Sequence, residues 1–158
     1  MSAVKITDDV YWVGVKDPNL EIFDIIMPTK YGTTYNSYLI KSEKVALIDT
    51  VKKGFTDEFL ANIEEITPLG SIDYLVVNHT EPDHSGSILE LLKHAPHIQI
   101  ICSSTAKVFV KNVLNTNDNL TGLKDNAFIE LGAKKLMIKQ TPYMHWPDTM
   151  MEFLVEDG

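Results

Sequence analysis

Short apolar runs broken by turn residues fill the first fifty positions, and this pattern predicts β-strands. The clearest of the turns is formed by Ser42, Glu43 and Lys44. Successive strands joined by short turns favour an antiparallel meander. The strands expected in this part cover residues 10–15, 22–27, 34–40 and 45–48.

Beyond residue 50 the apolar positions recur first at helical spacing and then switch between strand and helix patterns. Phe55, Phe59 and Ile63 mark one side of a helix that ends by Pro68, and Thr56 is a suitable N-cap for it. The remaining expectations are strands over 74–77, 98–101, 127–131, 135–140 and 150–155, helices over 88–92 and 108–114 (the second capped by Ser103 and Ser104), and a polar loop over 115–126.

Strands that come first and are followed by alternating helices and strands predict a mixed sheet covered by helices, an α/β (α+β) fold. In such sheets, binding and catalytic sites collect at the carboxyl ends of the strands. The buried-type strand over residues 74–77 runs directly into His79. We therefore look for chemistry there.

Length, charge and composition restrict the kind of protein, partner and metal site that the chain can have. A chain of 158 residues predicts a single domain with a real core, and its net charge of −8 disfavours a nucleic-acid partner. No apolar run reaches the roughly 18–20 residues that cross a membrane, and no secretory signal is visible, so we expect a cytoplasmic protein without a membrane partner. The single Cys102 excludes an all-cysteine metal site, and we expect it to be a buried small hydrophobe.

Four potential metal ligands occupy six positions at a strand-to-helix junction: His79, Glu81, Asp83 and His84. Two imidazoles and two carboxylates without a thiolate suit iron, manganese or zinc. A single catalytic zinc uses three protein ligands, so a larger set favours two metals. Two plainer interpretations are a solvated polar loop and a metal-free acid–base pair, but the second leaves two of the four residues without a role.

A second histidine, His145, follows the strand expected over residues 135–140. Taken alone, a histidine beside Trp146 is more often a packed structural residue, but the first motif turns the interpretation toward a fifth ligand. Asp148 is either a partner that holds an imidazole or a turn residue after Pro147, and we favour the turn. 

The other polar positions fit structural roles better than chemistry. We interpret His94 and His97 as surface residues at a helix end and residues 31–36 as a strand-edge turn rather than a pocket mouth. Asp49 and Thr50 end a strand, and we expect them to support the metal loop structurally.

The pattern His-x-Glu-x-Asp-His at residues 79–84 resembles the metal loop of the flavodiiron proteins, a branch of the metallo-β-lactamase superfamily. Glu81 stands where the wider superfamily has a histidine, and this makes the resemblance specific to the di-iron branch. Further matching segments are residues 32–39, 47–50, 74–77, 83–86 and 145–148, in order along essentially the whole chain.

This resemblance implies an αβ/βα sandwich and an enzyme that reduces O2 to water, nitric oxide to nitrous oxide, or both. One iron would take His79, Glu81 and His145, and the second would take Asp83 and His84. Electrons would come from rubredoxin or a similar donor through FMN on a flavodoxin-like domain, and the family forms head-to-tail homodimers.

The family pattern continues beyond Gly158 with a bridging aspartate and a further histidine. We therefore expect residues 1–158 to be one incomplete di-iron domain, the N-terminal part of the sandwich, without the flavodoxin-like domain. A fragment, a partner chain, a split gene or a degenerate homologue would each account for this, and we favour a piece of something larger. A strand over residues 150–155 facing water would otherwise be an aggregation liability.

Two further functions remain open at this point. The first is a zinc hydrolase of the same superfamily, against which Glu81 argues. The second is a non-catalytic di-iron module that binds or senses oxygen without flavin.

Overall fold

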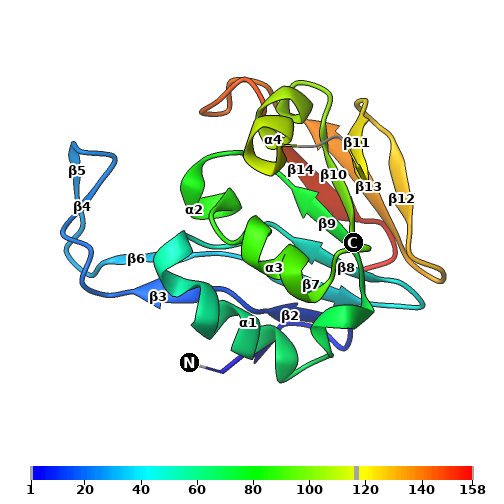
Figure 1. Ribbon diagram of the computed structural model, residues 1–158, viewed down its shortest axis with the longest axis horizontal. Coiled ribbons are helices and arrows are strands. Elements are labelled where there is room, and N and C mark those ends of the chain that lie inside the picture. The colour runs from blue at the N-terminus through cyan, green and yellow to red at the C-terminus, as the bar shows by residue number, and fades with distance from the viewer. Residues whose placement is uncertain (1, 116–117, 158) are drawn as a thin grey trace.

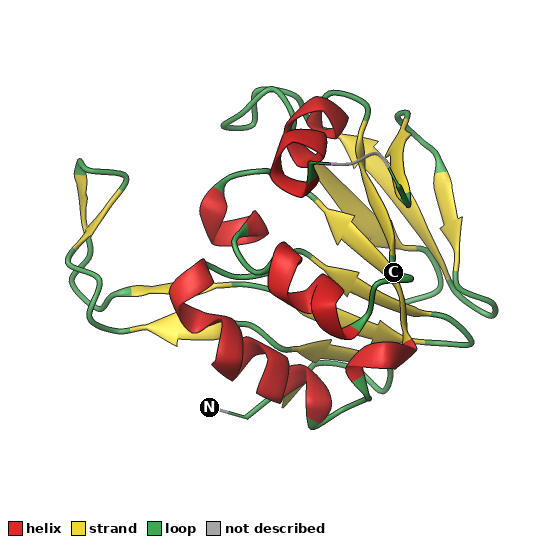
Figure 2. Ribbon diagram, viewed as in Figure 1, coloured by secondary structure: helices red, strands yellow, loops and turns green. Residues whose placement is uncertain are grey.

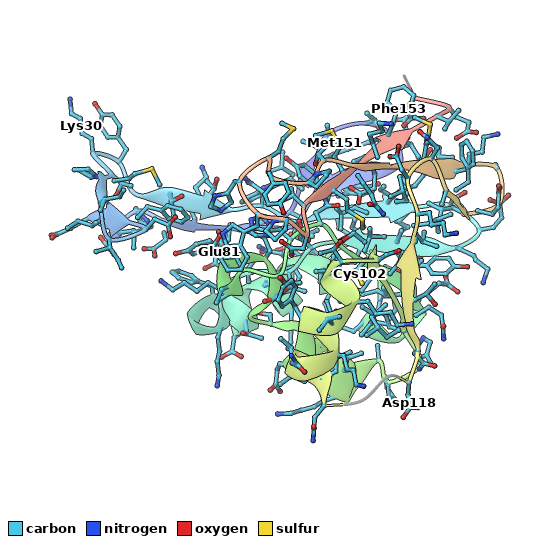
Figure 3. The ribbon with its side chains drawn as sticks, turned by 90° about the horizontal axis from the view of Figure 1, so that it is seen from above. Lys30, Glu81, Cys102, Asp118, Met151 and Phe153 are labelled. Atoms are coloured by element: carbon cyan, nitrogen blue, oxygen red, sulfur yellow. The ribbon has the colours of Figure 1, made fainter. Side chains whose placement is uncertain are left out.

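The computed structural model describes residues 2–115 and 118–157. A large sheet is covered by helices on one face, and a smaller sheet packs on its other face (Figure 1; Figure 2). Seen from above, the helices, the large sheet and the small sheet follow one another as three layers (Figure 3). In the part of the chain that is described, no helix has the length and apolar character needed to cross a membrane.

The large sheet has seven strands and changes from antiparallel to parallel pairing along its width. Pairing is antiparallel from its first edge to β8 and parallel from β8 to its last edge, which confirms the expected mixed sheet. Its strands in spatial order are β1 (Val4–Lys5), β2 (Val10–Trp12), β7 (Tyr38–Lys41), β8 (Val45–Ile48), β9 (Ile72–Val77), β10 (Gln99–Ser103) and β11 (Leu120–Leu123).

The small sheet is antiparallel and contains the last three strands, with β14 at an edge. Two shorter pairs complete the strands: β3 with β6, and β4 with β5. The bounds are β12 (Phe128–Glu130), β13 (Lys135–Gln140), β14 (Met150–Leu154), β3 (Val15–Asp17), β6 (Thr33–Tyr35), β4 (Ile22–Phe23) and β5 (Met27–Pro28).

The helices connect the parallel strands and cover the face of the large sheet that is opposite the small sheet (Figure 2). They are η1 (Lys53–Phe55), α1 (Thr56–Glu64), η2 (Leu69–Ser71), α2 (Pro82–Ser85), α3 (Ile88–His94) and α4 (Ala106–Leu114). The expected helices after residues 55, 87 and 105 are confirmed.

Strands β8 and β9 are apolar on both faces because they lie between two cores. Leu47 and Leu75 pack toward the helices, whereas Ala46 and Val76 pack toward the small sheet. Successive side chains of a strand point to opposite faces, so a continuous apolar run is what a doubly covered strand requires.

Two expected strands are each divided between different sheets. The run over 10–15 becomes β2 and β3, and the run over 34–40 becomes β6 and β7. The chain bends at Gly14, where a side-chain carbon would collide with the carbonyl oxygen of Tyr35. Such close backbone approach needs glycine, and a β-rich composition does not reveal it.

The strand expected over residues 22–27 is wrong. The segment is a hairpin of two-residue strands, β4 and β5, that protrudes from the body (Figure 1). Asp24 and Ile25 turn the chain with φ angles of +51° and +68°, and the Ile25 side chain is 92% exposed. An apolar run alone cannot distinguish an exposed hairpin from a buried strand.

The polar loop expected over residues 115–126 instead contains β11, which pairs with β10 and buries Leu120; its residues 116–117 lie outside those described.

The expected helix caps also differ from those in the structure. Thr56 is the first residue of α1 and donates to the Lys53 carbonyl, so it is not the N-cap. Ser103 Oγ accepts a hydrogen bond from the Ala106 amide, although Thr105 occupies the N-cap position of α4.

The doubly covered strands should dominate stability. Replacing the fully buried Leu75 with alanine should lower the free energy of unfolding by about 2–5 kcal/mol, since a cavity forms between the helices and the sheet. The matched control is Leu89→Ala, at a side chain that is 51% exposed, which should change it by no more than about 0.5 kcal/mol. Urea denaturation measures both, and equal effects would contradict this layered core.

Candidate metal centre

The candidate ligand loop leaves the carboxyl end of β9 and closes into the single turn α2. Pro82 is suited to the start of this turn because a first-turn amide has no helical partner to lose. Gly86 closes the turn where a side-chain carbon would lie 2.5 Å from the Pro82 carbonyl oxygen and 2.7 Å from the Lys53 amide nitrogen. The motif thus has a fixed backbone on both sides.

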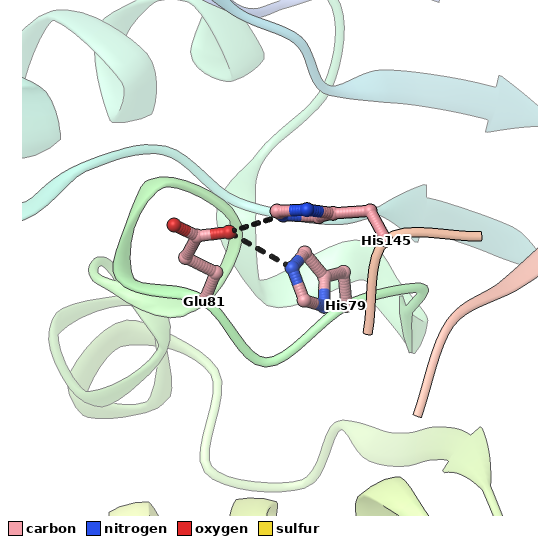
Figure 4. Close-up of side chains that lie close together, drawn as sticks. All are labelled: His79, Glu81 and His145. Carbon is pink, nitrogen blue, oxygen red and sulfur yellow. Dashed lines mark hydrogen bonds and ion pairs between the residues drawn. The ribbon is translucent and has the colours of Figure 1, made fainter. Parts of the chain in front are cut away.

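Three of the five expected ligands converge on one point. Glu81 Oε2 lies 3.0 Å from His79 Nε2 and 2.9 Å from His145 Nε2 (Figure 4). One potential ligand atom from each of these residues lies within 4.8 Å of those of the other two. A carboxylate oxygen between two imidazole nitrogens is an arrangement that could hold a metal ion.

His145 reaches this point from a strained turn between β13 and β14. Its φ angle is +89°, a region that residues with a side chain rarely adopt. The turn is held by a hydrogen bond from the Tyr143 amide to the Trp146 carbonyl and by one from the Met144 amide to the Thr141 carbonyl. Strain of this kind clusters at functional sites, where it aims a side chain.

The other two expected ligands lie beside the first three as an adjacent pair. His84 Nε2 is 3.6 Å from Asp83 Oδ2, and the rings of His79 and His84 are 5.3 Å apart between centroids. Asp83 Oδ1 is buried and has no hydrogen-bond partner among the described residues. A buried acceptor without a donor is the kind of atom that a cation would satisfy.

Asp148 lies in a turn, as expected, but it is also fully buried and anchors the loop, which is the role that we did not favour. Its Oδ1 lies 3.3 Å from His79 Nδ1, and its Oδ2 accepts hydrogen bonds from the Thr80 amide at 2.9 Å and the Thr80 hydroxyl at 2.6 Å. A carboxylate at Nδ1 fixes the imidazole tautomer that leaves Nε2 as a ligand. Position 148 follows a proline, and that context alone suggested a turn.

Asp49 supports His84 at its Nδ1 atom in the same way that Asp148 supports His79. This confirms the expected structural support from residues 49 and 50. Asp49 Oδ2 lies 3.1 Å from His84 Nδ1, and its Oδ1 accepts a hydrogen bond from the Asn78 amide at 2.7 Å. The amide and hydroxyl of Thr50 both donate to the His84 carbonyl. Two carboxylates therefore hold the two loop histidines from behind.

The ionisation of the loop follows from these contacts. Burial raises the pKa of Glu81, but hydrogen bonds from His145 and His79 outweigh it, and the pKa lies below its ordinary value. Burial also raises the pKa of Asp83, and there it prevails over the attraction of His84. For His84, burial lowers the pKa, but the Asp49 carboxylate outweighs burial and the pKa is raised. Oppositely charged neighbours thus compensate one another across the site.

A pocket of about 210 Å³ opens onto the carboxylates of the loop. Tyr35 lines it, so the residues interpreted as a strand-edge turn include one wall of the site. The Tyr35 hydroxyl donates to Asp17 Oδ2, and burial raises its pKa to about 12. The residues around the pocket are Leu20, Ile22, Phe23, Asp24, Tyr35, Lys52, Glu81, Pro82 and Asp83.

The remaining expectations about single residues are confirmed. His94 and His97 are exposed at the end of α3 and far from the loop in the chain. Cys102 is fully buried in β10, and burial raises its pKa to about 12, as expected of an inert thiol.

Comparison with known proteins gives a consistent result. A family model described as "ODP family beta lactamase" matches residues 33–156. The chain is 47% identical to the flavo-diiron protein FprA2 of Clostridium acetobutylicum, in an alignment that covers 99% of the chain and 40% of that protein. It is 38% identical to a nitric oxide reductase of Moorella thermoacetica, with 98% of the chain and 39% of the relative covered.

Solved structures agree with the sequences. The rubredoxin oxygen:oxidoreductase of Desulfovibrio gigas superposes with a TM-score of 0.94 at 32% identity, over 98% of this chain and 39% of that one. The flavodiiron protein of Giardia intestinalis gives a TM-score of 0.92 at 30% identity, over 99% and 38% of the two chains. The expected fold, part of a metallo-β-lactamase-like sandwich, is confirmed, and the chain spans about 40% of the length of FprA2.

The anchoring role of Asp148 is testable by metal binding. In Asp148→Asn only one side-chain oxygen remains for the three donors, so we expect metal affinity to fall about 10- to 100-fold. Anaerobic equilibrium dialysis with ferrous iron measures it. Asp8→Asn, at a carboxylate whose side chain is 95% exposed, is the control with the same change in charge and should bind as tightly as the unaltered protein.

Proposed function

Because the chain belongs to the ODP β-lactamase family and, within it, to the flavodiiron proteins, we propose that it forms part of a di-iron oxidoreductase that reduces O2 to water, nitric oxide to nitrous oxide, or both. The observation that carries this proposal is the Glu81 carboxylate held between His79 and His145. Relatives named for these two activities, a nitric oxide reductase and a rubredoxin oxygen:oxidoreductase, support it.

We assign His79, Glu81 and His145 to one iron and Asp83 and His84 to the second. The first three residues meet at one point, and the other two form a neighbouring pair with a buried carboxylate oxygen in need of a partner. Imidazoles and carboxylates together support both ferrous and ferric ions. The residues present fit two iron ions better than one zinc.

The bound irons would supply the electrons and coordination sites that reduction of O2 or coupling of two NO molecules needs. The protein residues set the conditions for that chemistry. Asp148 and Asp49 keep the Nδ1 atoms of two histidines occupied, so that the Nε2 atoms face the centre. Glu81 remains ionised because its pKa is lowered, and it therefore contributes negative charge.

The pocket beside the loop suits a small uncharged substrate. Leu20, Ile22 and Phe23 form an apolar wall against which water is poorly held. This apolar wall favours an uncharged diatomic gas over the polar substrates of a zinc hydrolase.

We propose that residues 1–158 form one incomplete domain and that further polypeptide covers the outer face of the small sheet. Phe128, Met151 and Phe153 are 50%, 45% and 46% exposed on β12 and β14. Met151 and Phe153 point away from the other layers (Figure 3). An apolar sheet face of this kind is normally covered, and the covering segment would bring the remaining ligands and a flavodoxin-like domain with FMN.

For electron delivery we propose a rubredoxin-like donor and a head-to-tail homodimer in which the flavin of one subunit serves the iron site of the other. The hairpin of β4 and β5 supports this arrangement. Ile25 and Ile26 are 92% and 81% exposed at its tip, and its base lines the pocket. Exposed apolar residues beside a site mark a surface that a partner covers.

The iron proposal is tested by metal counting and rapid kinetics. We expect two iron ions per protein and rapid consumption of O2 or NO in separate stopped-flow runs with a reduced flavin donor. Glu81→Gln should lower iron affinity about 10- to 100-fold and activity with it, because a neutral amide replaces a charged ligand. Glu64→Gln, an exposed site on α1, is the matched control. One zinc per chain without iron would refute the proposal.

The dimer proposal is tested at the hairpin. The double substitution Ile25→Asp and Ile26→Asp should convert a dimer into a monomer and leave the iron content unchanged, because charge at the tip opposes burial in an interface. Analytical ultracentrifugation measures the change. Leu89→Asp, on exposed helix surface, should leave the dimer intact. A hairpin variant that stays dimeric would place the interface elsewhere.

A further inference from the structure

An acidic side chain interrupts the apolar inner face of β14. Along this strand Met150 and Leu154 pack into the core between the two sheets, and Glu152 stands between them on the same face, opposite Ile138 of β13. Its Oε1 atom is buried. A charged residue placed at a core position needs a physical reason, since ionised carboxylates are expensive to bury without a cation.

The buried polar atoms around Glu152 include more acceptors than donors. Asn78 Nδ2 donates to Glu152 Oε2 at 2.9 Å. Glu152 Oε1 and Asn78 Oδ1 are both buried, and neither has a partner among the described residues. If Glu152 were ionised, both atoms would be acceptors. A proton on the carboxyl supplies the missing donor, and turning the amide around would not remove that need, because Oδ1 would then face Oε2.

The electrostatic surroundings agree with a neutral carboxyl. Burial, with a smaller contribution from the Asp49 charge, raises the pKa of Glu152 to about 8 against the lowering effect of the Asn78 hydrogen bond. The groups that face it are Asp49 from the segment after β8, Asn78 from the end of β9 and the apolar Ile138 from β13. At neutral pH the proton is therefore held, but weakly enough to be released by a modest change in local charge.

This carboxyl is connected to the metal loop by short steps. Asn78 immediately precedes His79, and the Asn78 amide donates to Asp49 Oδ1 at 2.7 Å. The second oxygen of Asp49 lies 3.1 Å from His84 Nδ1. Charges separated by so little protein of low dielectric constant influence one another strongly.

We propose that Glu152 is a proton-storing residue of the metal centre, whose protonation compensates changes of charge at the irons. This inference rests on the proposed function. With iron bound, the Glu152 carboxylate would take up one proton from solvent at a carboxyl oxygen when the centre gains one electron from reduced flavin. It would release that one proton when the electron passes to O2 or NO, whose reduction consumes protons. Glu152 acts through charge and not as a ligand.

The first test needs no metal. Infrared difference spectra of the intact protein at pH 7 should contain the carbonyl band of a protonated buried carboxyl that is absent from Glu152→Gln and present in the control Glu64→Gln, at an exposed residue of α1. Raising the pH should remove the band with a midpoint near 8. If the unaltered protein and Glu152→Gln have identical spectra, Glu152 is ionised and the proposal fails.

The pH dependence of the folding equilibrium should report the same proton. Since the folded state binds this proton more tightly than the unfolded state, the stabilisation is complete below the ordinary pKa of 4.5 and is lost as pH rises toward about 8. In that window the folding constant of the unaltered protein should fall by about tenfold per pH unit relative to Glu152→Gln. Denaturation of the two proteins over this range measures the difference, and parallel curves would overturn the storage of a proton.

The coupling to the metal centre is tested by redox titration of the iron-loaded protein. One proton taken up per electron should make the midpoint potential fall by up to roughly 59 mV per pH unit. Glu152→Gln, whose amide can still bond to Asn78, should keep its iron but lose most of this slope, whereas Glu64→Gln should keep both. An unchanged slope in Glu152→Gln would refute the coupling.

The outcomes separate this inference from the proposed function. A protein without bound iron would refute the proposed function and the coupling with it, and the infrared band would still decide whether Glu152 holds a proton. Normal iron content and O2 or NO reduction, with no band and no change of slope, would refute the role of Glu152 alone.

Discussion

The carboxylate of Asp148 is the interaction on which the site depends most. It belongs to the connection between β13 and β14, yet all three of its donors come from the loop after β9. Together with the hydrogen bond from Asn78 to Glu152, it adds directional contacts to the apolar packing between the two sheets, which is not directional. With it, His145 and His79 are held in a fixed relation, so that two proposed ligands 66 positions apart in the chain reach the same carboxylate.

The features that the sequence predicted well are those encoded locally. The loop at 79–84, its place after a buried strand and the mixed sheet follow from apolar runs and from the chemistry of four neighbouring side chains. His145 was found because its residue type matched a site already suspected. What could not be predicted depends on tertiary contacts: the burial of Asp148, the bend at Gly14 and the pairing of β11 with β10. No short-range pattern carries that information.

Each of the two sheets supplies different residues of the site. The large sheet fixes the backbone of the loop and supplies Asp49 from the end of β8, whereas the small sheet supplies His145 and Asp148 and places Glu152 behind the loop. Each loop histidine is thereby supported by an acid from a different layer. The packing between the sheets, centred on Ala46, Val76 and Ile138, therefore determines the geometry of a polar site to which these apolar residues contribute no proposed ligand.

The φ angle of +89° at His145 has a consequence for how the protein can evolve. A residue with a side chain in such a conformation costs about 1–3 kcal/mol, which glycine would not incur. Selection for stability alone would therefore favour glycine here, and under the proposed role of His145 as an iron ligand its imidazole is kept at the expense of stability. At position 145 the requirements of stability and of the proposed site conflict. Residues elsewhere in the fold therefore have to supply the stability that this backbone conformation costs.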